Sequence, residues 1–220
     1  MQAKSLKWVA LFAAGMAYVE AAAVVYLRRV LGVTDLIRDM APFDRQIACV
    51  ETGREVATLI MIGALGWAVG RSWQARWAFA CFTFGLWDIF YYGWLRVLLC
   101  WPRSLFEPDV LFLIPLPWWG PVLSPVLIAL LAAVGGAMAV RQDDRGYAIR
   151  PGPARWAAFL AGTLAALYAF MADAIAALPA STEELGRLKP TAFAWPVYLI
   201  GLILMSWSVF SALRGAQPKS

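Results

Sequence analysis

The sequence of 220 residues contains no histidine. This absence excludes a haem ligated by histidine and the histidine-containing sites of zinc, copper and non-haem iron. It also excludes catalytic pairs in which histidine activates a serine or cysteine nucleophile. A metal ion would have to bind carboxylate oxygens, which suit magnesium, calcium or manganese. We therefore predict no cofactor and no metal site, with Mg²⁺ bound through carboxylates as the open alternative.

Cysteine is scarce. The chain has three cysteines, Cys49, Cys81 and Cys100, and no CxxC spacing. Free cysteine commonly serves as a small apolar residue in a helix interior, and we expect this role for all three. A disulfide between Cys49 and Cys100, which lie near the same predicted membrane face, is the alternative.

Charged residues make up only 15% of the chain, whereas 62% of its residues are hydrophobic. The mean hydropathy is +0.66. A soluble domain contains about 45–50% apolar and about 25% charged residues, so the apolar excess is too large for one buried core. The composition predicts an integral membrane protein. No basic run with interleaved aromatic residues accompanies the net charge of +5, so no nucleic acid is expected as a partner.

The apolar runs predict an all-α polytopic membrane protein, a bundle of six transmembrane helices in a single domain over residues 1–220. A bilayer core about 30 Å thick needs about 20 apolar residues per span, which leaves no room for a soluble domain. The first run is too long for a signal peptide and continues past Ala23, so we expect a retained helix. The spans are predicted at about residues 6–27, 47–69, 77–100, 122–140, 156–178 and 193–213.

Two segments between the spans differ from simple connections. Residues 101–121 contain five prolines together with Trp118 and Trp119. Because proline at this density prevents a continuous helix, we expect a Pro/Trp-rich loop that is re-entrant or lies at the interface, between the third and fourth helices. Residues 33–40 are predicted to form a short amphipathic helix on the membrane surface.

Lysine and arginine are unevenly divided between the two predicted membrane faces. Ten lie on the side that holds both termini and seven on the other side. Because cytoplasmic loops carry the excess of lysine and arginine, we predict a multi-pass protein of the cell membrane with both termini in the cytoplasm. Membrane lipid is then an obligatory partner, while a protein partner and the oligomeric state stay open.

Five carboxylates and two arginines fall inside the predicted spans. Each costs about 2.5–3.5 kcal/mol at the centre of a spanning helix, so such residues normally face the bundle interior and mark functional sites. Consecutive spans run in opposite directions, and at a rise of about 1.5 Å per residue all seven lie in the same half of the membrane. They are Glu20, Glu51, Arg54, Glu55, Asp88, Arg96 and Asp173.

Helical periodicity gathers these residues on common faces. The three in the second span share an arc of about 100°, and the two in the third span lie eight residues apart on one face. Asp173 belongs to a stripe of small residues in the fifth span, which lets another helix approach closely. The five carboxylates outnumber the two arginines by three. Since a buried unpaired carboxylate takes up a proton or binds a cation, we expect a protonated acid, a metal ion or a cationic substrate group in this site.

These residues favour an enzyme that carries out acid–base chemistry, an isomerisation or a cyclisation, on a lipophilic, isoprenoid-like small molecule. A protonated carboxylic acid in an aromatic pocket can protonate an alkene, an epoxide or a carbonyl, and a second carboxylate can remove a proton. The predicted catalytic residues are Asp88 and Glu55 as acid and base, supported by Glu20, Glu51 and Asp173. The predicted substrate-binding residues are Arg54 and Arg96, which orient the substrate or bind an anionic group, and the aromatic residues Trp87, Tyr91 and Tyr92.

Two other classes of function stay open. A proton- or cation-coupled transporter would use the carboxylates as a relay. Against transport stand the lack of an inverted repeat and the absence of charge in the second span after Glu55. A non-catalytic subunit of a membrane complex would pair the charges internally or with a partner protein.

Overall fold

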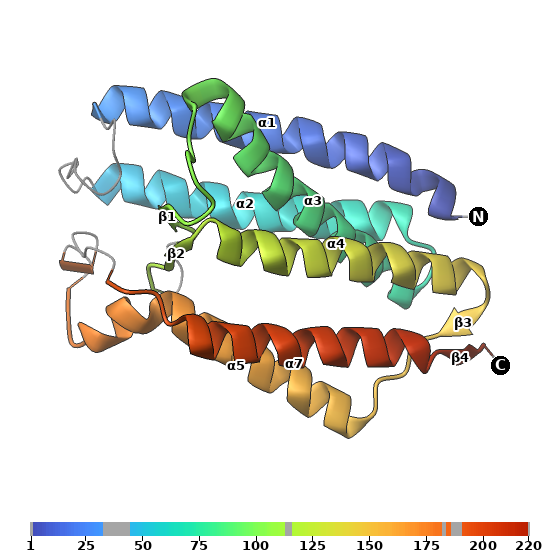
Figure 1. Cartoon of the computed structure of the whole chain (residues 1–220). Helices are drawn as coiled ribbons and strands as arrows, with labels where there is room; N and C mark the ends of the chain where they lie inside the picture. Colours follow the sequence, from blue (N-terminus) through green and yellow to red (C-terminus); the bar gives the residue numbers. More distant parts are fainter. Residues whose placement is uncertain (1, 33–44, 113–115, 182–183, 186–190, 220) are drawn as a thin grey trace.

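The computed structural model describes residues 2–32, 45–112, 116–181, 184–185 and 191–219, and these are mostly helical. The long elements are α1 (Leu6–Leu31), α2 (Arg45–Val69), α3 (Trp73–Leu99), α4 (Leu123–Asp144), α5 (Pro153–Ala176) and α7 (Trp195–Arg214) (Figure 1). The short ones are the 3₁₀ turn η1 (Gln2–Ser5) and the strands β1 (Pro108–Val110), β2 (Trp119–Pro121), β3 (Tyr147–Ala148) and β4 (Gln217–Pro218). The surface helix predicted for residues 33–40 lies outside the described residues.

The six long helices confirm the all-α class and coincide with the six predicted apolar segments to within a few residues. Local signals explain several of their ends. Ser72 caps α3 by accepting a hydrogen bond from the backbone N–H of Ala75 at 3.1 Å. Gly32 ends α1 with a φ of 66°, and Pro153 lies in the first turn of α5, where proline is tolerated.

Four segments are long and apolar enough to cross a membrane, namely Gln2–Val30, Leu123–Asp144, Pro153–Ala176 and Trp195–Arg214. Helices α2 and α3, with 25 and 27 residues, are just as long. They carry charged residues within their length, which lowers their hydropathy.

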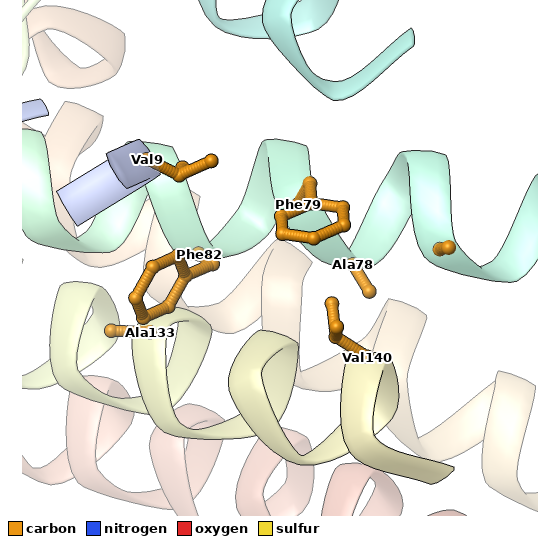
Figure 2. Packing of buried hydrophobic residues seen from close by; sticks show 7 residues of the cluster. Val9, Ala78, Phe79, Phe82, Ala133 and Val140 are labelled. Carbon is orange, nitrogen blue, oxygen red and sulfur yellow. The ribbon is translucent and has the colours of Figure 1, made fainter. Parts of the chain in front are cut away.

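Helix α3 lies at the centre of one group of helices, where it packs against α1, α2 and α4 (Figure 1). Its Phe79 and Phe82 are buried together with Val9 of α1 and with Ala133 and Val140 of α4 (Figure 2). These contacts form the main apolar core of the four N-terminal helices.

Glycine allows α3 and α4 to approach closely. A side chain on Gly85 of α3 would collide with the backbone carbonyl of Ala129, and one on Gly136 of α4 would begin 2.5 Å from the carbonyl oxygen of Ala78. Such close approach of backbones is the way in which small residues pack helices inside membranes.

The remaining two helices, α5 and α7, pack against each other in the same manner. A Cβ atom on Gly162 would lie 2.6 Å from the carbonyl oxygen of Gly201, and the reverse holds at the same distance. The pair joins the other four helices through α4, because the hydroxyl of Tyr198 in α7 donates to the Ser124 carbonyl at 2.6 Å.

The described residues of the proline-rich segment between α3 and α4 are not helical, as the composition predicts, and they form an antiparallel hairpin. In this hairpin Asp109 of β1 lies opposite Gly120 of β2. A side chain on Gly120 would begin 3.0 Å from the ring of Phe170, so β2 lies directly against α5. The position of the hairpin relative to a membrane stays a prediction.

Cys49, Cys81 and Cys100 are free and exposed. The disulfide between Cys49 and Cys100 is therefore not formed. The expectation that the three thiols fill the helix interior is wrong, because all three side chains point away from the helix contacts.

Both termini lie at one end of the molecule (Figure 1). There the carboxylate of Asp143 accepts hydrogen bonds from the Ser72 hydroxyl at 2.6 Å, from Lys219 Nζ at 2.7 Å and from Gln2 Nε2 at 3.0 Å. Strand β4 also pairs with β3. These four side chains, here called the terminal clasp, tie η1, the α2–α3 turn, α4 and the C-terminal tail together.

Candidate functional site

The first part of the candidate site is an ion-pair network between α1 and α2. The guanidinium of Arg54 donates to Glu20, and it also donates to Glu51 Oε2 through Nη2 at 2.8 Å and through Nε at 3.0 Å. Thr58, one turn further along α2, donates its hydroxyl to the other oxygen of Glu20. Both oxygens of the buried Glu20 are thus occupied, and its charge is neutralised by Arg54.

The second part lies between α3 and the β1–β2 hairpin. The buried hydroxyl of Tyr92 donates to Asp109 Oδ2 at 3.1 Å. Asp88, one turn before Tyr92, is also buried, and its carboxylate is close enough to that of Asp109 for the two to repel each other. The geometry brings two buried acids and one phenol together.

Tyr91 connects the two parts. Its ring stacks on Trp87 with the ring centroids 6.1 Å apart, and it meets the Tyr92 ring edge-on at 5.2 Å. The Tyr91 side chain interacts electrostatically with Arg54 of the first part and with Asp109 of the second. We call the whole set the polar cluster, comprising Glu20, Glu51, Arg54, Thr58, Asp88, Tyr91, Tyr92 and Asp109.

A second arginine adjoins the polar cluster at the end of α1. The guanidinium of Arg28 lies 4.6 Å from the centre of the Trp101 ring, a cation–π contact. The Trp101 ring in turn lies 6.3 Å from that of Tyr92. Arg28 and Asp109 attract each other electrostatically, so this arginine partly compensates the acids.

The hairpin, outside the long helices, contributes an acid with an unusual proton affinity. Burial raises the pKa of Asp109 to about 6. The positive charge of Arg28, the hydrogen bond from Tyr92 and a backbone N–H at Val110 act in the opposite direction and are too weak to offset the burial. Asp109 therefore exchanges a proton close to neutral pH.

Three buried polar atoms of the polar cluster and its surroundings have no hydrogen-bond partner among the described residues. These are Asp88 Oδ2, Trp87 Nε1 and Arg28 Nε. A buried polar atom left without a hydrogen bond costs about 1–3 kcal/mol, and native proteins keep few of them. Asp88 Oδ2 is thus an acceptor or, when protonated, a donor that is available to a ligand.

Most of the sequence-predicted residues come together, and two do not. Glu20, Glu51, Arg54, Asp88, Tyr91 and Tyr92 belong to the polar cluster, and Trp87 adjoins it. Glu55, also predicted, is buried in α2 and is not without a partner.

Asp173 and Arg96 lie elsewhere. The carboxylate of Asp173, in α5, accepts hydrogen bonds from the backbone N–H and the hydroxyl of Thr191. Arg96 is exposed and donates to the carbonyl of Cys100 at 2.6 Å, which closes the end of its own helix. Their side chains face other neighbours than those of the polar cluster.

Asp109 and Arg28 were not predicted as members of the site. Asp109 lies in a segment without helical periodicity, yet the sequence contains one signal for it. It is the only charged residue from Pro108 to Val140. Arg28 was interpreted as the end of the first span, whereas α1 continues to Leu31 and keeps it in the last turns of the helix.

No group of three or more acidic or cysteine side chains within the described residues is arranged to hold a metal ion. Binding of Mg²⁺ through these carboxylates therefore gains no support from their geometry. Comparison of the chain with protein-family models, with curated proteins and with solved structures found no match. The function has to be inferred from the site itself.

Proposed function

We propose that the chain is an integral membrane protein in which all six long helices cross the bilayer. Every one of them exposes large apolar side chains that would otherwise face water, for example Leu11 in α1, Leu164 in α5 and Ile203 in α7, each more than 60% exposed. Extended apolar surface of this kind is rare on soluble monomers. The exposed apolar side chains support contact with lipid.

The two helices with internal charges are included for a geometric reason. Helix α3 packs against α1 and α4, which both meet the requirement for a span, and α2 packs against α3. At about 1.5 Å per residue α2 and α3 are about 38 and 40 Å long, enough for a bilayer core of about 30 Å. Ile60 in α2 and Val97 in α3 are more than 60% exposed, which suits a lipid-facing surface.

The end of the molecule that holds both termini is proposed to face the cytoplasm. Both termini lie there (Figure 1), as six spans require, and the predicted excess of lysine and arginine is on the same side. The polar cluster then lies in the half of the membrane away from the cytoplasm.

For the activity, we propose proton transfer to and from a lipophilic, isoprenoid-like substrate, resulting in isomerisation or cyclisation. The observation that supports it best is the pair Asp88 and Asp109, two buried acids whose charges repel each other, of which Asp88 keeps a buried oxygen without a partner among the described residues. Like charges held close together in a site of low polarity favour one shared proton. Such a pair contains an acid and a base at the same time.

The proposed chemistry conserves protons. The protonated member of the pair donates its proton to an alkene, epoxide or carbonyl of the substrate, and a cationic centre forms there. The ionised member then removes a proton from an adjacent carbon, which leaves an isomerised or cyclised product and the pair with one proton as before. Tyr92 holds Asp109 in place, and the neutralised Glu20–Arg54 network fixes α1 against α2 beside it.

Deuterium incorporation from solvent tests the proposal without knowledge of the product. Purified protein in nanodiscs is incubated in D₂O with a lipid extract of the expressing cells, and the isoprenoid fraction is analysed by mass spectrometry. We expect carbon-bound deuterium with the wild type and a loss of about 100-fold or more in Asp88→Asn and Asp109→Asn, the size of a general acid–base contribution.

Asp173→Asn is the matched control, because it removes the same group from a position outside the polar cluster, and its incorporation should stay within about twofold of wild type. Circular dichroism and thermal unfolding verify that the variants fold. Incorporation that is equal in wild type and Asp88→Asn would exclude the acid–base role. Proton-linked uptake into vesicles by the wild type, lost in Asp88→Asn, would favour a transporter instead.

A further inference from the structure

A groove runs along α7 at the terminal end, remote in sequence from every member of the polar cluster. Its volume is about 680 Å³, and its apolar wall includes Ile203, Trp207 and Phe210. Ile203 and Trp207, spaced by one helical turn, are 64% and 52% exposed. The apolar wall extends over about 12 Å of α7, from Leu202 to Phe210, and the groove continues to Gly215. A hydrocarbon chain can lie along this part of the helix.

The end of this groove is basic. Arg214 in the last turn of α7 and Arg155 in the first turn of α5 line it, together with the hydroxyl-bearing Ser211. Neither arginine forms an ion pair within the described part of the chain. The guanidinium of Arg155 is held against the backbone of Gly215, where a Cβ atom would lie 3.0 Å from its Nη2.

The backbone adds positive potential at the same place. Helix α5 begins at Pro153, and its N-cap residue Gly152 supplies no side chain to accept hydrogen bonds from the first turn. The backbone N–H groups of Arg155 and Trp156 already donate to the Gly152 carbonyl, so it is the helix dipole that favours an anion there. Two arginines without acidic partners, a helix N-terminus and an apolar wall therefore converge on one groove.

We propose that this groove binds one anionic phospholipid, with its phosphate between Arg155 and Arg214 and an acyl chain along Ile203 and Trp207. This inference rests on the membrane placement proposed above and is independent of the proposed chemistry. A phospholipid is the occupant whose charge and shape match both parts of the groove, because a free phosphate would leave the apolar wall uncovered. The arginines lie at the ends of their helices, at the depth of lipid headgroups.

Native mass spectrometry of the full chain, released from detergent and titrated with phosphatidylglycerol or phosphatidylcholine, tests the groove. We expect the first phosphatidylglycerol to bind at least about fivefold more tightly than phosphatidylcholine, and each arginine removed to weaken it by about fivefold. The variants are Arg155→Gln and Arg214→Gln. Arg214→Gln keeps the test decisive if Arg155→Gln does not fold, because Arg214 is exposed at the end of α7.

Arg150→Gln is the matched control, since Arg150 is exposed at the same end of the molecule but does not line the groove. It should leave the affinity for phosphatidylglycerol unchanged. Glycerol phosphate, offered without acyl chains, should not compete. Equal binding of the two lipids, or an equal effect of Arg150→Gln and Arg214→Gln, would contradict the proposed lipid site and leave the membrane placement unaffected. Recovery of the chain in the soluble fraction without detergent would overturn the membrane placement, and the groove with it.

Discussion

The hydroxyl of Tyr92 donates to Asp109 Oδ2 over 3.1 Å and thereby ties the middle of α3 to the hairpin that precedes α4. Both side chains are buried, so neither has water as a substitute partner. A carboxylate accepts this bond more strongly than a neutral acid does. The attachment of the hairpin to α3 is therefore coupled to the protonation of Asp109.

Because burial raises the pKa of Asp109 to about 6 from 3.8, we predict that a rise in pH destabilises the fold through this group. Between about pH 4 and 6 the folded chain keeps a proton that the unfolded chain has released. The stabilisation is complete below about pH 4 and is lost as the pH rises through 6, by up to about 3 kcal/mol.

Thermal unfolding in detergent from pH 4 to 7 measures this effect as the difference between the wild type and Asp109→Asn. Subtraction of the two profiles removes the titration of the groups that do not interact with Asp109, whereas Asp88, which is coupled to Asp109, contributes to the difference. We expect the wild type to lose stability relative to the variant across this range. Parallel profiles would show that the pKa of Asp109 is not raised in the folded state.

The crossing of α3 and α4 predicts opposite effects for two glycines of the same helix. A side chain on Gly85 would collide with Ala129, whereas no atom lies within 4 Å of the Cβ position at Gly93. Gly85→Ala should destabilise the protein by about 1–3 kcal/mol through overpacking. Gly93→Ala should stabilise it by up to about 1 kcal/mol, because alanine has the higher helix propensity.

Denaturation by a strong detergent titrated into a mild one, followed by circular dichroism, measures both glycine variants. Gly93→Ala serves as the control for the general effect of a methyl group in α3. Equal stability of the two variants would mean that α3 and α4 do not approach as closely as described.

The terminal clasp predicts a stabilising role for Asp143. Asp143→Ala leaves the donors of Gln2, Ser72 and Lys219 without their acceptor, which is expected to cost about 1–3 kcal/mol. Hydrogen exchange should show faster exchange in the C-terminal tail, whose strand β4 is held at the same place. Arg145→Gln, an exposed change two residues away, should shift stability by no more than about 0.5 kcal/mol.

The sequence predicted the helices well because their signals are local. The length of the apolar runs, the proline at residue 153 and the glycine at residue 32 act within one segment of chain. The same reasoning predicted a non-helical segment between α3 and α4 but not the hairpin, since β1 and β2 pair residues that lie 9 to 13 positions apart in the sequence.

The candidate site could be predicted only in part, because the sequence indicates the position of a residue along a helix but not which neighbouring element its side chain meets. Asp173 lies in a predicted helix, but α5 packs against α7 and the Asp173 carboxylate accepts hydrogen bonds from Thr191. Asp109 joins the polar cluster from outside the helices, through a hydrogen bond from Tyr92. Helical periodicity cannot predict such a contact. An excess of acids over arginines remains, because the polar cluster contains Glu20, Glu51, Asp88 and Asp109 but only Arg54, and Arg28 adjoins it.

The ion pair between Arg54 and Glu20 predicts that loss of Arg54 destabilises the protein strongly as long as Glu20 is present. Arg54→Met leaves the buried Glu20 without its cation, which is expected to cost about 3–5 kcal/mol. The exposed Arg96, bonded only to its own helix end, is the matched control, and Arg96→Met should cost less than about 1 kcal/mol.

The double variant Glu20→Leu/Arg54→Met tests whether the Glu20–Arg54 ion pair is needed for the stability of the fold. Removal of both partners eliminates the unpaired charge of the buried Glu20 and leaves only the less deeply buried Glu51 without its cation. The double variant should therefore recover at least about 2 kcal/mol relative to Arg54→Met, measured in the same detergent titration. Such a recovery would show that the ion pair is dispensable for folding. The contribution of the ion pair to the chemistry is measured separately, as the deuterium incorporation that the refolded double variant retains. Additive losses would instead mean that Glu20 and Arg54 each stabilise the bundle through contacts other than their mutual ion pair.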